Sequence, residues 1–549
     1  MYTNKENVLE LVALLKSHDI SHIVLCPGSR NIPIVKSIAK TDFFTCYSIT
    51  DERSASFFAM GLTIKHKKPC ALVVTSGSAL LNTAPALSEA FYQKLPLLVI
   101  SADRQQSFIG QMDGQTIHQD HIFPTITKKE VNLPEIYDKD TLWLCNRLIN
   151  EALLALRLDD TGPVHINVPI SDPFFNEDVD KLPMVRKIAY KDLKDVANII
   201  KSHKKIMIIL GQNQYPYMVD KNEKYENVVF ISEHLTNING LKTIENIEIL
   251  LGALDDDMKK SLAPDLVITI GGHILSKKLK IFLRQNNFTH INIMPTYDIA
   301  DVFFKLNYQV CAPFDKALDC ILESLSVKDN TKLCDINYAQ NFYALSHKIK
   351  EPNLNFSQVF VIGKVMHTLK ESYNLHLSNS STVRYAQLFK KTCNIEIQGN
   401  RGVNGIEGSL STAIGASSMH DDLSFIIIGD LSFFYDLNAL FNSHINKNVR
   451  IILINNEGGE IFGALPGLDL QEKSSRYILA THNFNAQGLC KDFNLEYIRA
   501  DSINSFEKAL SICSKKSDRA IIVEALTNKD NDIKLYKEYL NQVKALLKE

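Results

Sequence analysis

The sequence is poor in the residues that would indicate a disulfide-stapled, fibrous or membrane-spanning protein. Its 549 residues include ten scattered cysteines with no Cys-x-x-Cys spacing, so we expect reduced packing residues rather than a disulfide scaffold or a zinc site. The 23 glycines and 17 prolines are too few for a collagen-like or low-complexity chain. No apolar run approaches the roughly 18 residues of a spanning helix, and the start, Met-Tyr-Thr-Asn-Lys-Glu-Asn, lacks the pattern of a signal peptide. These absences predict a folded, cytoplasmic protein without a membrane span.

An excess of charge of either sign is also missing. The chain has 60 basic and 62 acidic residues and a formal charge of -2. Such a balance gives no global field that would attract nucleic acid or an anionic membrane, so any basic site must be local. We therefore expect no nucleic-acid partner.

The chain alternates β-branched runs with segments of helical periodicity, such as residues 54–65 and 79–93, as parallel sheets wound by helices do. Its length exceeds what one core usually organises. The expected strands fall into three sets: 22–26, 44–49, 71–75, 97–101 and 164–168; then 206–210, 228–231, 266–270 and 290–293; then 375–378, 394–398, 423–428, 450–454 and 520–524. We predict an α/β protein with three doubly wound parallel-sheet domains, at residues 1–185, 186–350 and 351–549.

Two polar residues of the last domain follow consecutive expected strands. Asp430 comes after Phe425-Ile-Ile-Ile-Gly429 and begins a stretch expected to be helical to about His444, and Asn456 lies 26 positions further on, about one βαβ crossing. Ligands of open α/β sheets bind at such strand ends. With the carbonyl of Gly458, the two side chains would give oxygen ligands for magnesium bound to a diphosphate. The alternative is a helix cap followed by a simple turn.

The first expected domain also has polar and small residues directly after its expected strands. Glu52, in Thr50-Asp51-Glu52-Arg53-Ser54, stands at a strand-to-helix junction, where the alternative is an acid favoured by the helix dipole. The turn Thr75-Ser76-Gly77-Ser78-Ala79 has small residues that would let a ring or phosphate approach the backbone.

Basic residues also follow strand ends, at Arg30, Arg104, Lys277 with Lys278, and Arg401. Arginine binds carboxylates in a bidentate manner, so a converging group of these residues would suit substrates with several carboxylates. Solvated surface charge is the alternative for each one alone.

Together these motifs resemble the thiamine-diphosphate synthase family of menaquinone biosynthesis. The resemblance runs from about residue 8 to about residue 525 and rests on six segments: Cys26-Pro27-Gly28-Ser29-Arg30, Asp51-Glu52-Arg53-Ser54-Ala55, Thr75-Ser76-Gly77-Ser78-Ala79, Ala102-Asp103-Arg104, Gly429-Asp430-Leu431-Ser432 and Asn455-Asn456-Glu457-Gly458-Gly459-Glu460-Ile461-Phe462. It implies a three-domain enzyme that decarboxylates 2-oxoglutarate and adds the succinyl carbanion to isochorismate, releasing carbon dioxide. It also implies active sites between subunits, in a homodimer or homotetramer.

The resemblance assigns a role to each matching residue. Glu52 would be the catalytic glutamate that hydrogen-bonds the aminopyrimidine of thiamine diphosphate. Metal ligands for magnesium or manganese would be Asp430, Asn456 and Gly458, and the cofactor would also contact Ile406, Ser432, Thr75 and Gly77. The substrate-binding residues would be Arg30, Arg104, Gln115, Lys277, Ser380, Arg384, Arg401, Ile461 and Phe462.

The chain departs from the family pattern at Asn31-Ile32 and at Lys278, where an arginine is common; lysine lacks the planar fork, which bears on how a substrate carboxylate is held. Two other functions stay open at this point. A thiamine-diphosphate 2-oxoacid decarboxylase or acetolactate-type synthase would share Glu52 and Asp430 but need no set of arginines. A non-catalytic nucleotide-binding protein would need the Gly-x-Gly-x-x-Gly fingerprint, which is absent after the first strand.

Overall fold

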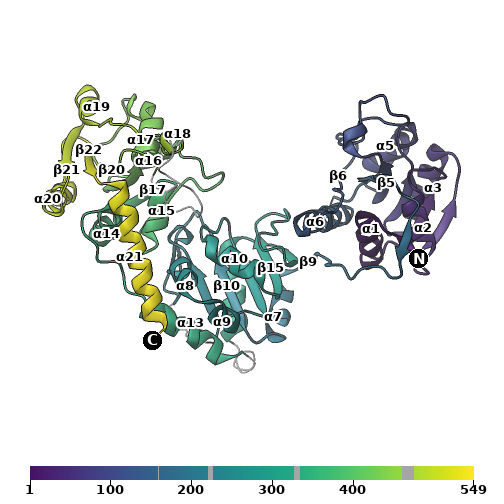
Figure 1. Cartoon of the computed structure of the whole chain (residues 1–549), viewed down its shortest axis with the longest axis horizontal. Coiled ribbons are helices and arrows are strands. Elements are labelled where there is room, and N and C mark those ends of the chain that lie inside the picture. Colours follow the sequence, from purple (N-terminus) through teal and green to yellow (C-terminus); the bar gives the residue numbers. More distant parts are fainter. Residues whose placement is uncertain (159, 220–224, 226, 327–333, 460–474, 549) are drawn as a thin grey trace. The chain divides into compact units, whose positions relative to one another are not determined.

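The computed structural model describes residues 1–158, 160–219, 225, 227–326, 334–459 and 475–548. Its contacts group the chain into two compact units (Figure 1). The first contains Met1–Lys191 and Asp298–Gln309, and the second contains Asp192–Tyr297 and Val310–Glu549. Each unit is described by itself.

The first unit has a six-stranded sheet in its described residues, with the order β3-β2-β4-β5-β7-β6 and all neighbours parallel. Its strands are β2 (His22–Leu25), β3 (Thr45–Ser48), β4 (Cys70–Val74), β5 (Leu97–Asp103), β6 (Lys129–Asn132) and β7 (Val164–Pro169). Its helices are α1 (Glu6–Ser17), α2 (Ile32–Ala39), α3 (Glu52–His66), α4 (Ser78–Leu81), α5 (Ala84–Tyr92), α6 (Lys139–Ala155) and the short η1 (Gln106–Phe108). Outside this sheet, β1 (Tyr2–Thr3) pairs with β8 (Glu177–Val179), and β9 (Ala189–Lys191) neighbours β16 (Leu306–Cys311).

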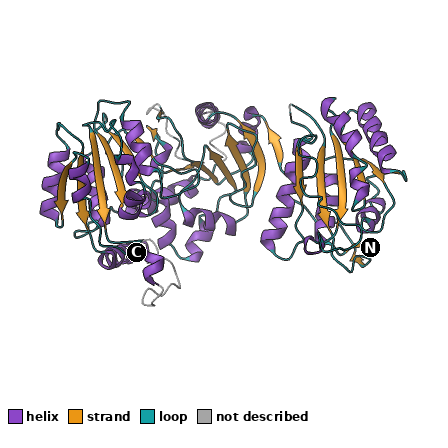
Figure 2. Cartoon of the chain, turned by 90° about the horizontal axis from the view of Figure 1, so that it is seen from above, coloured by secondary structure: helices purple, strands orange, loops and turns teal. Residues whose placement is uncertain are grey.

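Helices cover both faces of this sheet, because its strands are apolar on both sides (Figure 2). Successive residues of a strand point to opposite faces. Ile23 and Val73 pack in a core with residues of α1, α2 and α6, whereas their neighbours Val24 and Leu72 pack in a second core with residues of α3 and α5. The fold is therefore doubly wound, as strands buried on both sides require.

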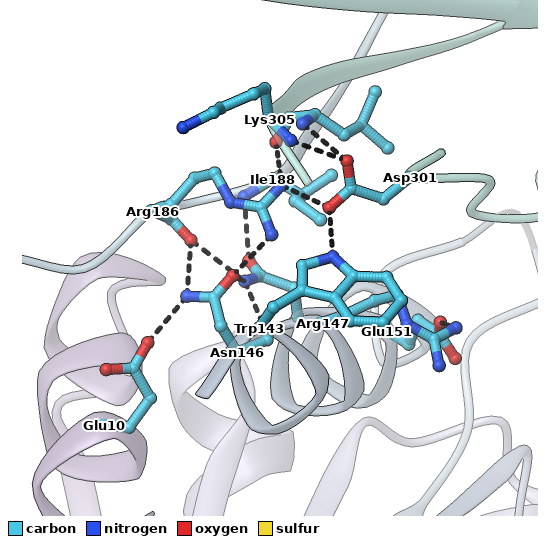
Figure 3. A network of polar contacts seen from close by, with 11 residues as sticks. Glu10, Trp143, Asn146, Arg147, Glu151, Arg186, Ile188, Asp301 and Lys305 are labelled. Atoms are coloured by element: carbon cyan, nitrogen blue, oxygen red, sulfur yellow. Dashed lines mark hydrogen bonds and ion pairs between the residues drawn. The ribbon is translucent and has the colours of Figure 1, made fainter. Parts of the chain in front are cut away.

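A buried polar network fixes the segment Asp298–Gln309 within the first unit (Figure 3). The Asp301 side chain is 0% exposed. Its Oδ2 accepts hydrogen bonds from Trp143 Nε1 at 2.8 Å and from Arg186 Nη1 at 2.6 Å, and its Oδ1 accepts from the Leu306 amide at 2.8 Å. A buried carboxylate is tolerated only when its oxygens are paired in this way, so this network ties the segment to α6.

In its described residues, the second unit contains two larger parallel sheets and one short parallel pair of strands. In the first, the order β12-β10-β14-β15 joins β12 (Val229–Ser232), β10 (Ile206–Leu210), β14 (Leu266–Ile270) and β15 (Thr289–Met294). Its other elements are α7 (Leu193–Lys201), α8 (Ile247–Ala253), α9 (Asp256–Ser261), α10 (Lys277–Gln285), α11 (Phe314–Ser326), α13 (Ile336–Lys348), η2 (His234–Thr236), and the parallel pair β11 (Tyr217–Met218) and β13 (Ile238–Asn239).

The other sheet of this unit has the order β18-β17-β19-β20-β22-β21, again parallel throughout. Its strands are β17 (Asn374–Leu377), β18 (Glu396–Gln398), β19 (Ser424–Gly429), β20 (Val449–Asn455), β21 (Glu496–Ala500) and β22 (Ile521–Leu526). The helices around it are α14 (Gln358–Thr368), α15 (Ser381–Ala386), α16 (Ser409–Ser417), α17 (Asp430–Tyr435), α18 (Ser475–Leu479), α19 (Gln487–Asp492), α20 (Ile503–Cys513), α21 (Lys529–Lys548) and η3 (Leu437–Leu440).

The predicted fold class is confirmed: parallel sheets are flanked by helices, and each expected strand is present within about two residues of its expected bounds. Two helix predictions were wrong. The expected helix 79–93 is divided into α4 and α5, with a proline in the first turn of α5, and the helix expected from Asp430 to about His444 ends at Tyr435. The domain boundaries at 185/186 and 350/351 stay a prediction.

All ten cysteines are free, as expected. Among the helices of the described residues, none is long and apolar enough to cross a membrane.

Candidate active site

The polar residues predicted at the last sheet meet in one cavity. Strands β19 and β20 are neighbours, with Gly429 opposite Ile454, so the residues that follow them lie side by side at the carboxyl edge of the sheet. The cavity there has a volume of about 130 Å³. Its lining residues are Gln358, Asn379, Ser380, Ser381, Thr382, Ile406, Gly429, Asp430, Leu431, Ser432, Ile454, Asn456, Gly458 and Gly459. We call this cavity the cradle.

Asp430 is the buried anion of the cradle, with a residue exposure of 3%. Its Oδ1 accepts a hydrogen bond from the Leu431 amide at 2.6 Å, and its Oδ2 accepts from the amides of Asn456 and Gly458 at 3.1 and 3.0 Å. Burial raises the pKa of this carboxyl, and the amide donors together with the nearby His482 oppose the rise. The carboxylate thus joins the two strand ends and fixes the backbone at residues 456–458.

His482 was missed by the sequence reasoning. Its Nε2 lies 3.3 Å from Asp430 Oδ2, and its Nδ1 accepts a hydrogen bond from the Phe484 amide at 3.2 Å. Because Nδ1 is an acceptor, the proton of a neutral ring is on Nε2, the atom that faces the carboxylate. No pattern near His482 in the sequence indicates this contact, which depends on the chain returning to the cradle after α18.

The residues of the cradle fit a metal that is shared with a diphosphate. Asp430, Asn456 and Gly458 all line it, and Gly458 has a φ of +149° and lies so close to the Leu479 carbonyl that an added Cβ would be 2.7 Å from that oxygen. In the described part of the chain, no group of three or more His, Cys, Asp or Glu residues could hold a metal ion. A metal in the cradle would therefore need amide and carbonyl oxygens and the oxygens of a bound phosphate, which is the usual coordination of magnesium.

The other predicted cofactor residues of the second unit lie in the same place. Ile406 and Ser432 both line the cradle, and the Ser432 hydroxyl donates a hydrogen bond to the Ile406 carbonyl. Ser380 also lines it and has a φ of +73°, a left-handed conformation that is costly for serine and that clusters at functional sites. The Ser432 contact holds the backbone of Ile406 against the wall of the cradle.

Arg401 is oriented by Asn379, a cradle residue that the sequence reasoning missed. Arg401 is 8% exposed, and its Nη1 donates to Asn379 Oδ1 at 2.8 Å. The Asn379 amide group donates in turn to the carbonyls of Asn400 and Gly405 at 2.7 and 2.6 Å. Burial and the like charge of Arg384 lower the pKa of the Arg401 guanidinium.

The predicted cations Arg384 and Lys277 are not paired. Within the described residues, the Arg384 guanidinium and the Lys277 ammonium have no hydrogen-bond or ion-pair partner. Lys280, missed by the sequence reasoning although it is in the run Lys277-Lys278-Leu279-Lys280, belongs to the same cationic group: burial lowers its pKa, and the charges of Arg401 and Arg384 lower it further. The second unit therefore has an excess of positive charge where substrate carboxylates are expected.

In the first unit, Glu52 begins α3 directly after β3 and its loop, where the carboxyl edge of that sheet was predicted to hold it. Asp51 is the N-cap, and its side chain accepts a hydrogen bond from the Ser54 amide at 2.7 Å. The neighbouring Asp51 therefore caps the helix, and the partly exposed Glu52 side chain has no partner among the described residues. This position in the first turn of α3 fits both readings of Glu52, the cofactor-binding glutamate and the acid favoured by the helix dipole, so its role stays a prediction.

The turn after β4 brings three other predicted residues together. Gln115 Nε2 donates to Thr75 Oγ1 at 3.4 Å and to the Ser76 carbonyl at 3.2 Å. Gly77 has a φ of +81°, and a Cβ added to it would lie 3.3 Å from Gln115, so a larger residue would be strained. Gln115 thus lies on the turn that contains Thr75 and Gly77.

Arg30 and Arg104 converge on one carboxylate. Arg30 is 5% exposed, and its Nη1 lies 3.3 Å from Asp172 Oδ1, while Arg104 Nη1 lies 3.8 Å from Asp172 Oδ2. Arg104 also pairs with Asp113 at 3.0 Å. Asp172, which the sequence reasoning missed, thus shows that these two arginines can share a carboxylate. The remaining predicted substrate residues, Ile461 and Phe462, lie outside the described residues.

Comparisons with known proteins show the family of the chain. Residues 9–123 match the family "Thiamine pyrophosphate enzyme, N-terminal TPP binding domain". The chain is 44% identical over 561 residues to the 2-succinyl-5-enolpyruvyl-6-hydroxy-3-cyclohexene-1-carboxylate synthase of Phocaeicola vulgatus, which covers 99% of both chains. It is 36% identical over 552 residues to the synthase of the same name from Flavobacterium johnsoniae (97% of this chain, 98% of the relative) and 32% identical over 550 residues to that from Cytophaga hutchinsonii (97% and 98%).

The fold, the cradle and the matched domain define a thiamine-diphosphate enzyme. Because the identity extends over almost the whole of both chains, the chain belongs to the 2-succinyl-5-enolpyruvyl-6-hydroxy-3-cyclohexene-1-carboxylate synthase family of menaquinone biosynthesis.

Proposed function

We propose that this chain catalyses the thiamine-diphosphate-dependent decarboxylation of 2-oxoglutarate and the transfer of the remaining four-carbon unit to isochorismate, with magnesium or manganese as the metal. Carbon dioxide leaves and a carbon–carbon bond forms. The observation that carries the proposal is the cradle, in which the buried Asp430 carboxylate lies with Asn456, Gly458 and Ser432 at the carboxyl edge of a parallel sheet.

The cofactor, when bound, supplies the electron sink for decarboxylation, and the protein orients the reactants and matches their charge. We assign the metal to Asp430, Asn456 and the Gly458 carbonyl. Ile406 would contact the apolar part of the cofactor, with Ser432 holding its backbone. In the first unit, the Glu52 carboxyl would hydrogen-bond the aminopyrimidine ring, while Thr75 and Gly77 let the ring approach the backbone.

The substrates would be held by charge. Arg30 and Arg104 already share one carboxylate, that of Asp172, so this pair has the geometry to bind another. Arg401 is oriented by Asn379. Arg384 and Lys277 have no partner among the described residues and would bind a ligand. Gln115 and Ser380 would supply polar contacts, and Ile461 and Phe462 an apolar wall. A pyruvate-specific decarboxylase would not need this number of cations, which favours a dicarboxylate donor.

We also propose a homodimer or homotetramer whose active sites form between subunits. Helix α3, which begins with Glu52, leaves Phe57, Phe58 and Ile64 exposed by 38%, 44% and 49%, and Leu81 of α4 is 47% exposed. Large apolar side chains gathered beside a catalytic residue are typical of a surface that another chain covers. Sedimentation of Phe58→Glu beside the unchanged chain tests this: a monomer with lost turnover is expected, and an unchanged assembly would contradict it.

Product analysis tests the reaction itself. Purified chain with thiamine diphosphate and magnesium receives isochorismate and uniformly carbon-labelled 2-oxoglutarate. We expect equal losses of both substrates, release of one labelled carbon as carbon dioxide, and a product that keeps the other four. Decarboxylation with no loss of isochorismate would leave the cofactor assignment and overturn the synthase.

A further inference from the structure

Glu524 is a buried carboxylate outside the groups assigned above to metal, cofactor and substrates. It lies in β22, within the otherwise apolar strand Ile521–Leu526, and the residue is 0% exposed. Strand β22 lies between β20, which leads into the cradle, and β21 (Figure 1). A carboxylate in the interior of a protein is tolerated only when its oxygens are paired, so the partners of Glu524 indicate its role.

Three donors from different segments meet at this carboxylate. Its Oε1 accepts a hydrogen bond from Asn455 Nδ2 at 2.7 Å, and its Oε2 accepts from the Tyr497 hydroxyl at 2.7 Å and from the Ala486 amide at 3.1 Å. Burial and the bond to Glu524 raise the pKa of the Tyr497 hydroxyl, so this group remains a donor at neutral pH. Glu524 thus joins the end of β20, strand β21 and the start of α19.

Asn455 links this carboxylate to residues 456–458, which we call the 456–458 turn. Asn455 is 2% exposed, and its Oδ1 accepts a hydrogen bond from the Glu457 amide at 3.2 Å, while its Nδ2 also donates to the Phe484 carbonyl at 2.9 Å. Glu457 has a φ of +63°, a left-handed conformation that is costly for glutamate and persists only where the surrounding structure holds it. The bond to Asn455 Oδ1 is one of the contacts that hold this turn.

The same carboxylate also fixes the segment that brings His482 to Asp430. Ala486, at the end of this segment, donates its amide to Glu524. The His482 ring stacks on that of Phe484, with centroids 5.6 Å apart and an angle of 16° between the planes, and its Nε2 lies 3.3 Å from Asp430 Oδ2. Glu524 is therefore bonded to two segments that contact the Asp430 carboxylate, one directly and the other through the side chain at the end of β20.

We propose that Glu524 is a positioning residue of the metal site, which sets the conformation of the 456–458 turn through Asn455. This role rests on the proposed function, in which the turn supplies two ligands of the metal. All three partners of Glu524 are donors, so both of its oxygens must be acceptors.

A glutamine has nearly the same shape as Glu524 but cannot replace it. Its amide nitrogen would face a donor in either orientation, Asn455 Nδ2 in one and the Ala486 amide in the other. In the first orientation Asn455 must rotate and lose its bond to Glu457. In the second the segment that contains His482 loses its anchor. Either outcome disturbs one side of the cradle.

Magnesium binding tests this role. The full chain, saturated with thiamine diphosphate, is titrated with magnesium in a calorimeter. In Glu524→Gln the Kd for magnesium should be about ten- to a hundredfold higher than in the unchanged chain, the usual effect of losing a group that orients a metal ligand. An unchanged Kd in a variant that melts at a lower temperature would mean that Glu524 only stabilises the fold, and would overturn the proposal.

Tyr497→Phe is the matched control. It removes a hydrogen bond to Oε2 of the same carboxylate and leaves the bond between Oε1 and Asn455 in place. Its melting temperature should fall, and its Kd for magnesium should equal that of the unchanged chain. An equal rise of the Kd in Tyr497→Phe and Glu524→Gln would indicate a general loosening of β22 and would overturn the proposal.

A double-mutant cycle tests the link through Asn455. Asn455→Ala should raise the Kd for magnesium by a factor similar to that of Glu524→Gln, and the double variant should show no further rise, because both changes break the same path. Additive rises would reject Asn455 as the link. If Glu524→Gln does not fold, Asn455→Ala decides alone, and an unchanged Kd in it overturns the proposal.

Hydrogen exchange in the free chain separates this proposal from the proposed function. Without cofactor or metal, the amides of the 456–458 turn should exchange faster in Glu524→Gln than in the unchanged chain and in Tyr497→Phe, because the contacts that hold the turn are weakened. Equal exchange in all three chains would overturn the proposal. Faster exchange in Glu524→Gln, together with an unchanged chain that binds no magnesium, would keep the control of the turn by Glu524 and reject the metal assignment.

Discussion

Replacing Asp430 by alanine should separate the structural role of this carboxylate from its role in holding the metal. In the unchanged chain its oxygens accept three backbone amides, at 2.6, 3.0 and 3.1 Å, from a position that is 3% exposed. Leaving buried donors without their acceptor costs about 1–3 kcal/mol. The substitution also removes the desolvation cost of burying the Asp430 carboxylate, and this gain offsets part of the loss. We therefore expect the free chain to lose about 1–3 kcal/mol of unfolding free energy.

The larger effect is expected on ligand binding. Thiamine diphosphate with magnesium at about 100 times the Kd should stabilise the unchanged chain by about 2.7 kcal/mol. Asp430→Ala removes the only carboxylate among the proposed metal ligands, so this stabilisation should disappear. The assay is calorimetric unfolding with and without cofactor and metal.

Asp436→Ala is the matched control for that experiment. Asp436 follows the same helix, α17, and its carboxylate accepts hydrogen bonds from the Ser411 amide and hydroxyl at 2.8 and 2.7 Å, but it does not line the cradle. This variant should lose some stability and keep the full shift on ligand addition. If Asp430→Ala kept the full shift as well, the assignment of the metal to the cradle would be wrong.

Three other changes test separate parts of the account. Glu52→Gln should bind cofactor yet lower kcat by about 10²- to 10⁴-fold, and near-normal turnover would reject its role. Asp172→Asn frees Arg30 and Arg104 from a carboxylate that is 61% exposed, in ion pairs worth up to about 1 kcal/mol, so one substrate KM should fall by up to about fivefold. An unchanged KM for both substrates would separate this arginine pair from the site. His376→Leu should raise the unfolding free energy by about 1–3 kcal/mol in calorimetry, because neither ring nitrogen has a partner in the described structure.

The same histidine predicts a pH dependence. Burial lowers the pKa of His376 to about 4. As pH falls below the unfolded value of about 6.5, the unfolded chain takes up the proton first, so stability decreases between about pH 6.5 and 4, by about 2 kcal/mol at pH 5. His376→Leu lacks this loss, and its advantage in melting temperature should grow from pH 7 to pH 5. An advantage that stays constant would contradict the assignment.

The sequence predicted the features that depend on strand periodicity and chain order. The places of Asp430, Asn456 and Glu52 follow from where parallel strands end, which apolar runs indicate. The strands that were missed include β6, β9 and β21, each at the edge of its sheet. Edge strands are half-exposed, as the mixed sequence Lys129–Asn132 shows, so they lack the continuous apolar run of a central strand.

Contacts between distant residues could not be predicted from one sequence. Asn379 orients Arg401, His482 faces Asp430, and Asp172 joins Arg30 to Arg104, each across a loop whose path no local pattern sets. The unpaired state of Arg384 is a similar case, since only the packing of α8, α15 and α21 shows that no acidic side chain of the described residues pairs with it.

The most direct test of the central claim is the ratio of kcat/KM for 2-oxoglutarate to that for pyruvate, measured as isochorismate consumption with thiamine diphosphate and magnesium present. The free cations predict a strong preference for 2-oxoglutarate, about ten- to a hundredfold for each charge-assisted bond that pyruvate cannot form. Equal values for the two acids, or no isochorismate consumption with either, would contradict the account.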